Sequence, residues 1–217
     1  MAGRRYDLYE ILSLMPTSSE DVGIPLLPSL GRRVFHMTSG SAIPVLAIFT
    51  PLETMMALMA TLSVIAIIVE TGRRFSKSLN LIFLRLFSPL LKQAERDGIT
   101  GATYLSLASL LALLMFDKSV AVAALLFLSI GDPVAALVGN RIGGPRFFGK
   151  SPVGTLAFAL ASLSIASMLM VTDVIQHHWA IGVGASIAAL VELVPLRIDD
   201  NVTIPLISGG AMTLMLG

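Results

Sequence analysis

Seven long apolar runs dominate this sequence and constrain its fold more than any other feature. With 55% hydrophobic and only 13% charged residues, the chain holds more apolar surface than one soluble core could bury. A helix of about 20 apolar residues crosses a bilayer, and shorter runs fit a thin or tilted bundle. We therefore expect an all-α, polytopic membrane helix bundle with about seven transmembrane helices. The runs cover roughly residues 34–50, 54–69, 100–116, 119–139, 152–171, 179–194 and 202–217.

Two further segments are amphipathic, and we expect them to lie along the membrane surface. In residues 1–30, Leu8, Ile11 and Met15 recur at helical spacing beside charged residues, which is typical of an interfacial helix. A similar apolar stripe occurs over about residues 75–94. We expect one integral membrane domain over 1–217, with 1–30 as its interfacial segment and 34–217 as the transmembrane bundle. The absence of cysteine from the sequence excludes disulfides and thiolate metal sites.

The distribution of basic residues predicts the orientation of the bundle. If all seven runs cross, the N-terminus and the loops at 70–99, 140–151 and 195–201 share one side. Every Lys and Arg of the chain except Lys118 lies on that side. Because cytoplasmic loops carry the excess of basic residues, we expect this side to face the cytoplasm and the C-terminus to lie on the outer side. The net charge of +1, with basic residues that follow topology, argues against nucleic acid as a partner.

The segment from Gly144 to Ser151 spells the phosphate-binding pattern G-x-x-x-x-G-K-S. A P-loop requires a preceding β-strand within a parallel sheet, whereas a predicted membrane helix precedes this segment, so we do not expect that fold. The chemistry of an anion site can still be present. Ser151 followed by proline is a good cap for the next helix, and a helix N-terminus with Lys150 just before it attracts anions. Arg141 and Arg146 add positive charge, or alternatively anchor lipid headgroups.

Asp132 is the most informative residue inside the apolar runs. A carboxylate near the bilayer centre costs about 2.5–3.5 kcal/mol on insertion scales, so such a residue is a candidate functional group. Gly131 and Pro133 flank it, and we expect them to weaken the helix at this point. Broken membrane helices often line binding cavities, so we expect a cavity beside Asp132.

A second acidic group occurs on the same predicted side of the membrane. Glu192 ends the sixth run, and Asp199, Asp200 and Asn201 open the seventh. Any one of the last three could be an ordinary helix cap. Carboxylates also suit Mg²⁺, which usually binds one or two of them together with substrate phosphates. Metal ligands predicted on this basis are Asp132, Glu192, Asp199 and Asp200, and the chemistry is phosphoryl or nucleotidyl transfer to a lipid.

These residues, in this order, resemble the CTP-dependent lipid kinases: dolichol kinase, phytol kinase and the yeast-type diacylglycerol kinase. The resemblance extends over most of the chain, including Glu70 with Arg73 and Glu95 with Thr100 and Gly101. It rests on Arg32-Arg33-Val-Phe-His36, on Gly131-Asp132 with Ala135 and Gly139, on Gly149-Lys150-Ser151-Pro-Val-Gly154-Thr155, on Glu192, and on Asp200-Asn201-Val-Thr-Ile204-Pro205. The chain has Val153 where many prenol kinases have an acidic residue, so the motifs do not choose between the three branches.

The resemblance implies CTP as the phosphoryl donor, Mg²⁺ as the cofactor and a membrane lipid alcohol as the acceptor, a polyprenol such as dolichol above all. It assigns catalysis to Asp132, Lys150 and Asp200, with Arg33, His36, Glu70 and Glu95 in supporting roles. Predicted contacts to the nucleotide are Arg141, Arg146, Gly149, Lys150, Ser151, Gly154, Thr155 and Asn201.

Two other functions use similar residues. A CTP-dependent phosphatidate cytidylyltransferase would need much the same cationic loop and metal site, and would release pyrophosphate instead of CDP. An anion transporter could use Asp132 and a basic mouth for permeation, but it would need polar residues that continue to the outer face. The outward halves of the apolar runs carry almost no charge, which favours a site open to the cytoplasm and the membrane.

Overall fold

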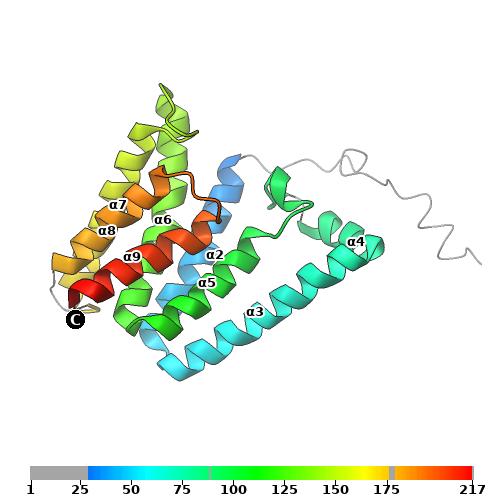
Figure 1. Ribbon diagram of the computed structural model, residues 1–217, viewed down its shortest axis with the longest axis horizontal. Helices are drawn as coiled ribbons and strands as arrows, with labels where there is room; N and C mark the ends of the chain where they lie inside the picture. Colours follow the sequence, from blue (N-terminus) through cyan, green and yellow to red (C-terminus); the bar gives the residue numbers. More distant parts are fainter. Residues whose placement is uncertain (1–28, 88, 176–178, 217) are drawn as a thin grey trace, which may run out of the picture.

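The computed structural model describes residues 29–87, 89–175 and 179–216, and the named secondary-structure elements in this part of the chain are all helices joined by short loops (Figure 1). A single 3-10 turn, η1 (Gln93–Glu95), interrupts the series of α-helices. The α-helices are α2 (Ser29–Phe49), α3 (Leu52–Phe75), α4 (Lys77–Phe87), α5 (Gly101–Met115), α6 (Lys118–Ile142), α7 (Pro152–Val171), α8 (Trp179–Leu193) and α9 (Asp200–Leu216).

Each of the seven predicted apolar runs coincides with one of these helices. Three of them, α3, α6 and α7, are long and apolar enough to cross a membrane, and α5 and α8 are shorter apolar helices. The all-helical prediction and the membrane character of the chain are thus confirmed, while seven crossings and their orientation stay predictions. The interfacial helix expected within residues 1–30 lies outside the described residues.

Helix α6 forms the centre of the bundle (Figure 1). It packs against α2, α5, α7, α8 and α9, and every residue from Val120 to Ser129 is buried. A helix that is apolar all round is typical of a buried core position or of a membrane span, and α6 occupies the core of this bundle. By contrast, α3 runs along the edge of the molecule and packs mainly on α5, with α4 folded back at its far end. The central helix is therefore a fixed frame for any group that projects from it.

The helix around Asp132 differs from the sequence-based expectation. We expected Gly131 and Pro133 to weaken it, but α6 continues through both residues. Gly131 has a packing role, since a Cβ at this position would lie 2.8 Å from the ring of Phe158 on α7. Pro44 likewise lies inside a continuous α2. Prolines are tolerated in membrane helices because neighbouring groups satisfy the freed carbonyls.

The amphipathic segment predicted over 75–94 forms a shorter helix than expected. Helix α4 ends at Phe87, and Pro89 follows two residues later, where its ring and missing N–H oppose a continuing helix. The chain then turns through η1 before α5 begins. The placement of this segment along the membrane surface stays a prediction.

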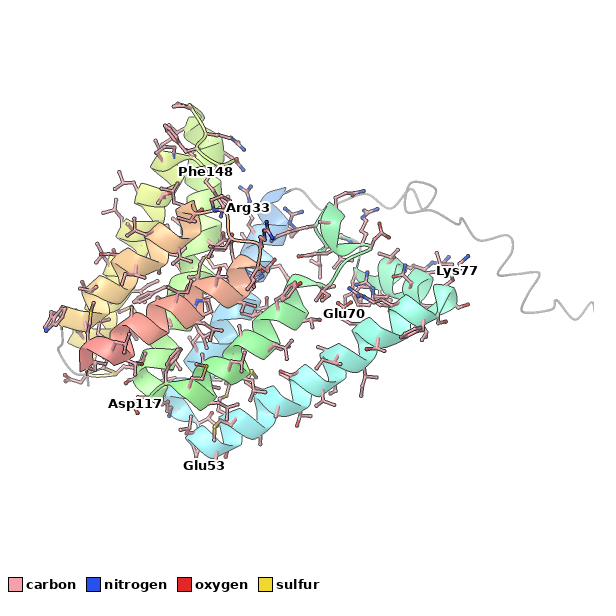
Figure 2. The ribbon with its side chains drawn as sticks, viewed as in Figure 1. Arg33, Glu53, Glu70, Lys77, Asp117 and Phe148 are labelled. Atoms are coloured by element: carbon pink, nitrogen blue, oxygen red, sulfur yellow. The ribbon has the colours of Figure 1, made fainter. Side chains whose placement is uncertain are left out.

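The two ends of the bundle carry different residues. Figure 2 shows Glu53 and Asp117 together at one end, and Arg33 and Phe148 at the opposite end. Helices α6 and α7 cross closely at this second end, where a Cβ on Gly154 would lie 2.7 Å from the carbonyl oxygen of Ala135. This crossing brings the loop between α6 and α7 close to the start of α9.

Candidate active site

The loop between α6 and α7 is a tight turn and not a P-loop. The backbone N–H of Phe147 donates to the carbonyl of Lys150 at 2.9 Å, and the N–H of Lys150 donates back at 2.9 Å. Between them, Phe148 and Gly149 have φ angles of 52° and 83°, which is the geometry of a two-residue type I′ turn. No strand precedes this turn within the described residues. The turn fixes the direction in which Lys150 leaves the backbone.

Lys150 links two acidic residues from different helices. Its ammonium Nζ lies 2.8 Å from Oδ2 of Asp200 and 3.1 Å from Oε1 of Glu192. Glu192 is almost fully buried, and its second oxygen accepts a hydrogen bond of 2.9 Å from the hydroxyl of Thr155. A buried carboxylate requires such partners, because an unpaired charge is costly in a low-dielectric interior. Glu192 and Asp200, on different helices, thus share the cation of Lys150, which lies 50 positions before Asp200 in the chain.

The ammonium of Lys150 is firmly protonated. Burial lowers the pKa of Lys150, but the hydrogen bond and charge of Asp200, followed by the charges of Glu192 and Asp132, outweigh burial and raise the pKa above its ordinary value. The side chain remains 29% exposed, so an incoming anion can reach it. A protonated lysine at the entrance of a cavity is a good ligand for phosphate oxygens.

Asp132 faces the same cavity as Lys150 and Asp200. Two hydrogen bonds between α2 and α6 define the level of Asp132 along the helices of the bundle. Arg33 donates to the carbonyl of Ala136 at 2.9 Å, and the hydroxyls of Ser41 and Ser129 lie 3.0 Å apart. Asp132 lies between Ala136 and Ser129 along α6, about 6 Å below Ala136 at 1.5 Å per residue.

The cavity has a volume of about 960 Å³ and two chemically different parts. One part, which we call the polar end, is lined by Arg33, His36, Asp132, Lys150, Glu192 and Asp200. The other part, which we call the apolar arm, is lined chiefly by side chains of α2, α3 and α4, among them Ile43, Leu62, Ile65, Val69, Phe83 and Phe87. A cavity of this size fits a ligand site, and its two parts match a ligand with a charged head and an apolar tail.

Most of the predicted site residues line this cavity. They are Arg33, His36, Glu70, Glu95, Asp132, Arg146, Gly149, Lys150, Ser151, Gly154, Glu192, Asp200 and Asn201. Ser151 also caps α7, as expected, by accepting a hydrogen bond from the N–H of Gly154. The structure therefore brings together residues from α2, α3, η1, α6, α7, α8, α9 and the loop that leads into α7.

Three predicted site residues do not line the cavity. Arg141 is exposed at the end of α6. The hydroxyl of Thr155 donates a hydrogen bond to Glu192, which does line the cavity. Asp199 accepts hydrogen bonds from the backbone N–H and the side-chain amide of Asn201, at 2.9 and 2.6 Å, and so caps α9.

Glu70 and Glu95 contribute mainly to structure. Glu70 accepts from the N–H of Thr100 at 2.9 Å and pairs with Arg73 at 3.4 Å. The guanidinium of Arg73 also donates to the backbone carbonyls of Glu95 and Arg96. Glu95 in turn accepts from the N–H groups of Lys92 and Gly101. These bonds attach α3 to the segment before α5 and so hold one wall of the cavity.

The donor set at the polar end suits a divalent cation bound together with phosphate. No group of three or more His, Asp or Glu side chains forms a ligand cluster within the described residues. Glu192 and Asp200, however, already share one positive group, the ammonium of Lys150. Mg²⁺ commonly takes only one or two carboxylates and completes its shell with phosphate and water oxygens.

Several lining residues were not predicted as site residues. Asn140 lines the polar end and accepts a hydrogen bond of 3.1 Å from Arg146, and Lys92 also lines the cavity. Phe83 and Phe87 of the apolar arm lie with ring centroids 4.9 Å apart. Phe83 belongs to the apolar stripe that predicted an amphipathic helix over 75–94, but a sequence pattern alone does not say which cavity such a face will line.

Comparison with known proteins gives three relatives. An uncharacterized protein of Rickettsia prowazekii is 28% identical over 181 residues, which cover 81% of this chain and 88% of that protein. A protein of Oryza sativa subsp. japonica named "Probable phytol kinase 2, chloroplastic" is 28% identical over 199 residues. A protein of Glycine max named "Probable phytol kinase 3, chloroplastic" is 31% identical over 128 residues. The chain is thus similar to two proteins named as probable phytol kinases.

These relatives confirm the resemblance to lipid-alcohol kinases that the motifs predicted. The match to the Oryza protein covers 82% of this chain and 64% of that protein, and the match to the Glycine protein covers 52% and 40%. The chain thus spans less than two thirds of the phytol kinases it matches. No protein-family model matches the chain, and no solved structure matches it.

Proposed function

We propose that this protein transfers a phosphoryl group to the hydroxyl of a membrane lipid alcohol. The observation that carries the proposal is the single cavity in which Lys150, Asp200, Glu192 and Asp132 meet an apolar arm. The phytol kinases to which the chain is related support the same class of reaction. Acceptors in this class include dolichol and other polyprenols, phytol, geranylgeraniol and diacylglycerol.

CTP is the proposed donor, and its phosphates would lie at the polar end. Phosphoryl transfer spreads negative charge over the phosphoryl oxygens, so catalysis depends mainly on positioning and on positive charge. Lys150 would leave one or both carboxylates to bind the phosphates, with Arg146 and Arg33 nearby in the same cavity. Glu192 and Asp200 would hold Mg²⁺, which supplies charge neutralisation to the triphosphate.

Asp132 is the proposed proton acceptor for the alcohol. The substrate oxygen attacks the terminal phosphorus, a new O–P bond forms, and the bond from that phosphorus to the bridging oxygen breaks to release CDP. The hydroxyl proton passes to the carboxylate of Asp132. This residue suits the role because it lies where the polar end meets the apolar arm, and a positioned base contributes about 10²–10⁴-fold.

The transporter alternative finds less support in the cavity. A transporter would need a polar route to the end of the bundle that carries Glu53 and Asp117 (Figure 2). Among the described residues that line the cavity, no charged side chain comes from that end. A cytidylyltransferase would use the polar end in a similar way, so the position of the label in the product must separate it from a kinase.

The test is a transfer assay with purified protein in detergent. CTP labelled either at the γ- or at the α-phosphate is incubated with Mg²⁺ and, separately, with dolichol, phytol, geranylgeraniol, diacylglycerol and phosphatidate. A kinase moves only the γ-label to an alcohol, whereas a cytidylyltransferase moves the α-label to phosphatidate. ATP in place of CTP tests the choice of donor. Absence of γ-label from every alcohol with either nucleotide would contradict the proposal.

A further inference from the structure

The apolar arm of the cavity is bounded by one face of α3. Leu62, Ile65, Ala66 and Val69 all line the cavity and follow the i, i+3, i+4, i+7 spacing of a single helix face. Leu62, Ile65 and Val69 are 41–51% exposed, so this face is open and not filled by other side chains. Met55 and Met59, on the face toward the core, are buried. The cavity face of α3 is therefore distinct from its packing face.

A face of α2 lies across the cavity from α3. Phe35, Ser39 and Ile43 recur at intervals of four residues along α2 and line the same cavity. Helices α2 and α3 are consecutive and are joined near Thr50. There Lys118 of α6 donates to the carbonyls of Ile48 and Thr50, at 3.1 and 2.8 Å. This contact fixes the joined end of the two helices, and the space between them is a slot.

The slot changes from apolar to polar along its length. On α2 the lining passes from Ile43 to Arg33, and on α3, which runs in the opposite direction, it passes from Leu62 to Glu70. The contacts of Arg33 with Ala136 and of Ser41 with Ser129 place Asp132 at the height where this change occurs. A ligand that follows the slot would thus place an apolar chain between the helices and a polar group beside Asp132.

We propose that the hydrocarbon chain of the substrate alcohol lies in the slot between α2 and α3, and that Ala66 sets the width of this slot. The inference rests on the proposed function and specifies where its substrate binds. Ala66 is the smallest side chain of the α3 face, so a large side chain at this position would close the slot without touching Asp132 or Lys150. The neighbouring Ile68 is 64% exposed and does not line the cavity, which makes it a matched control on the same helix.

The first experiment measures binding directly. Because the chain has no cysteine, Leu62→Cys and Ile68→Cys each provide a single site for a nitroxide label. Leu62 lines the slot and is already large, so a label there leaves the width at Ala66 unchanged. We expect phytol, added without nucleotide, to reduce the mobility of the label in the Leu62→Cys variant and to leave the label in the Ile68→Cys variant unchanged. Equal responses at the two positions, or no response at either, would overturn the proposal.

The second experiment measures specificity. Ala66→Trp is expected to lower kcat/KM for phytol about tenfold or more, mainly through KM, because it removes room for the chain. The same variant should use the short alcohol prenol within about twofold of wild type, and Ile68→Trp should behave as wild type with both alcohols. Loss of activity toward prenol as well, or equal behaviour of the two tryptophan variants, would overturn the placement of the chain. The proposed function is tested separately, with the wild-type protein, and is contradicted if that protein phosphorylates no alcohol.

Discussion

Two clusters of opposite charges in this molecule look alike in the sequence but differ in their contacts. In one, Arg73 is 6% exposed and its guanidinium is engaged by Glu70, by Asn80, by two backbone carbonyls and by the ring of Phe83. In the other, the ammonium of Lys150 pairs with the carboxylates of Glu192 and Asp200, and its side chain remains 29% exposed. A buried cation held by backbone carbonyls stabilises a wall of the cavity. A partly exposed cation held by carboxylates can exchange one of them for a substrate phosphate.

Among the substitutions that test this difference between the two clusters, we expect the largest effect from a change at Lys150. Lys150→Met should lower turnover about 10³-fold, because a charge aimed at the phosphates is lost. It should destabilise the protein less than Arg73→Met does, because Lys150 is 29% exposed and Glu192 keeps its hydrogen bond from Thr155. Turnover with labelled CTP and thermal unfolding in detergent provide the two measurements. Arg85→Met, an exposed arginine of α4, is the control and should keep full activity. Unfolding of the Lys150→Met protein would show that this cluster is structural as well.

Arg73 should show the opposite pattern. Arg73→Met removes one partner of a buried ion pair and leaves Glu70 without its cation, which typically costs about 3–5 kcal/mol of unfolding free energy. Chemical denaturation in detergent measures this loss. Arg74→Met, at an exposed position of the same helix, should change stability by less than about 0.5 kcal/mol. A stable Arg73→Met protein with lost turnover would reverse the roles assigned to the two clusters.

The crossing of α6 and α7 connects Lys150 to the frame of the bundle and should respond less strongly. Gly154→Ala places a Cβ 2.7 Å from the carbonyl oxygen of Ala135, and such overpacking costs about 1–3 kcal/mol. We expect lower stability together with reduced turnover, since the Lys150 turn would shift relative to α9. Gly182→Ala, which meets no atom within 4 Å, should be neutral or slightly stabilising. Equal unfolding free energies for the two variants would argue against a close crossing.

The cap of α7 should give the smallest effect. Ser151→Ala removes the acceptor for the N–H of Gly154 and should lower the unfolding free energy by about 1 kcal/mol. Ser186→Ala, an exposed serine inside α8, is the control. If the variant instead loses turnover at unchanged stability, the hydroxyl of Ser151 contacts the substrate and belongs with Lys150 in the exchangeable cluster.

The sequence predicted the helices well because a bilayer imposes a simple rule on apolar runs. It also identified Asp132, Lys150, Glu192 and Asp200, since charged residues next to long apolar segments stand out. We expected Gly131 and Pro133 to weaken the helix, whereas α6 continues through both. The space beside Gly131 is filled by Phe158 of α7, and no local pattern reports a partner on another helix.

The structural role of Arg73 was equally hidden in the sequence. Its main acceptors are backbone carbonyls more than 20 residues away, and every residue has a carbonyl. Gly154 shows the same limit, because its motif indicates phosphate binding while its geometry is that of a close helix crossing. Three-dimensional contacts decide between such roles, and the sequence supplies only the candidates.

The most direct test of the central claim is the turnover of an Asp132→Asn variant with γ-labelled CTP and phytol. This change keeps the shape of the side chain but removes its ability to accept the proton. If Asp132 takes that proton at the junction of the two parts of the cavity, turnover should fall by about 10²–10⁴-fold, while CTP affinity and unfolding temperature stay at wild-type values. Turnover near the wild-type rate would contradict the claim.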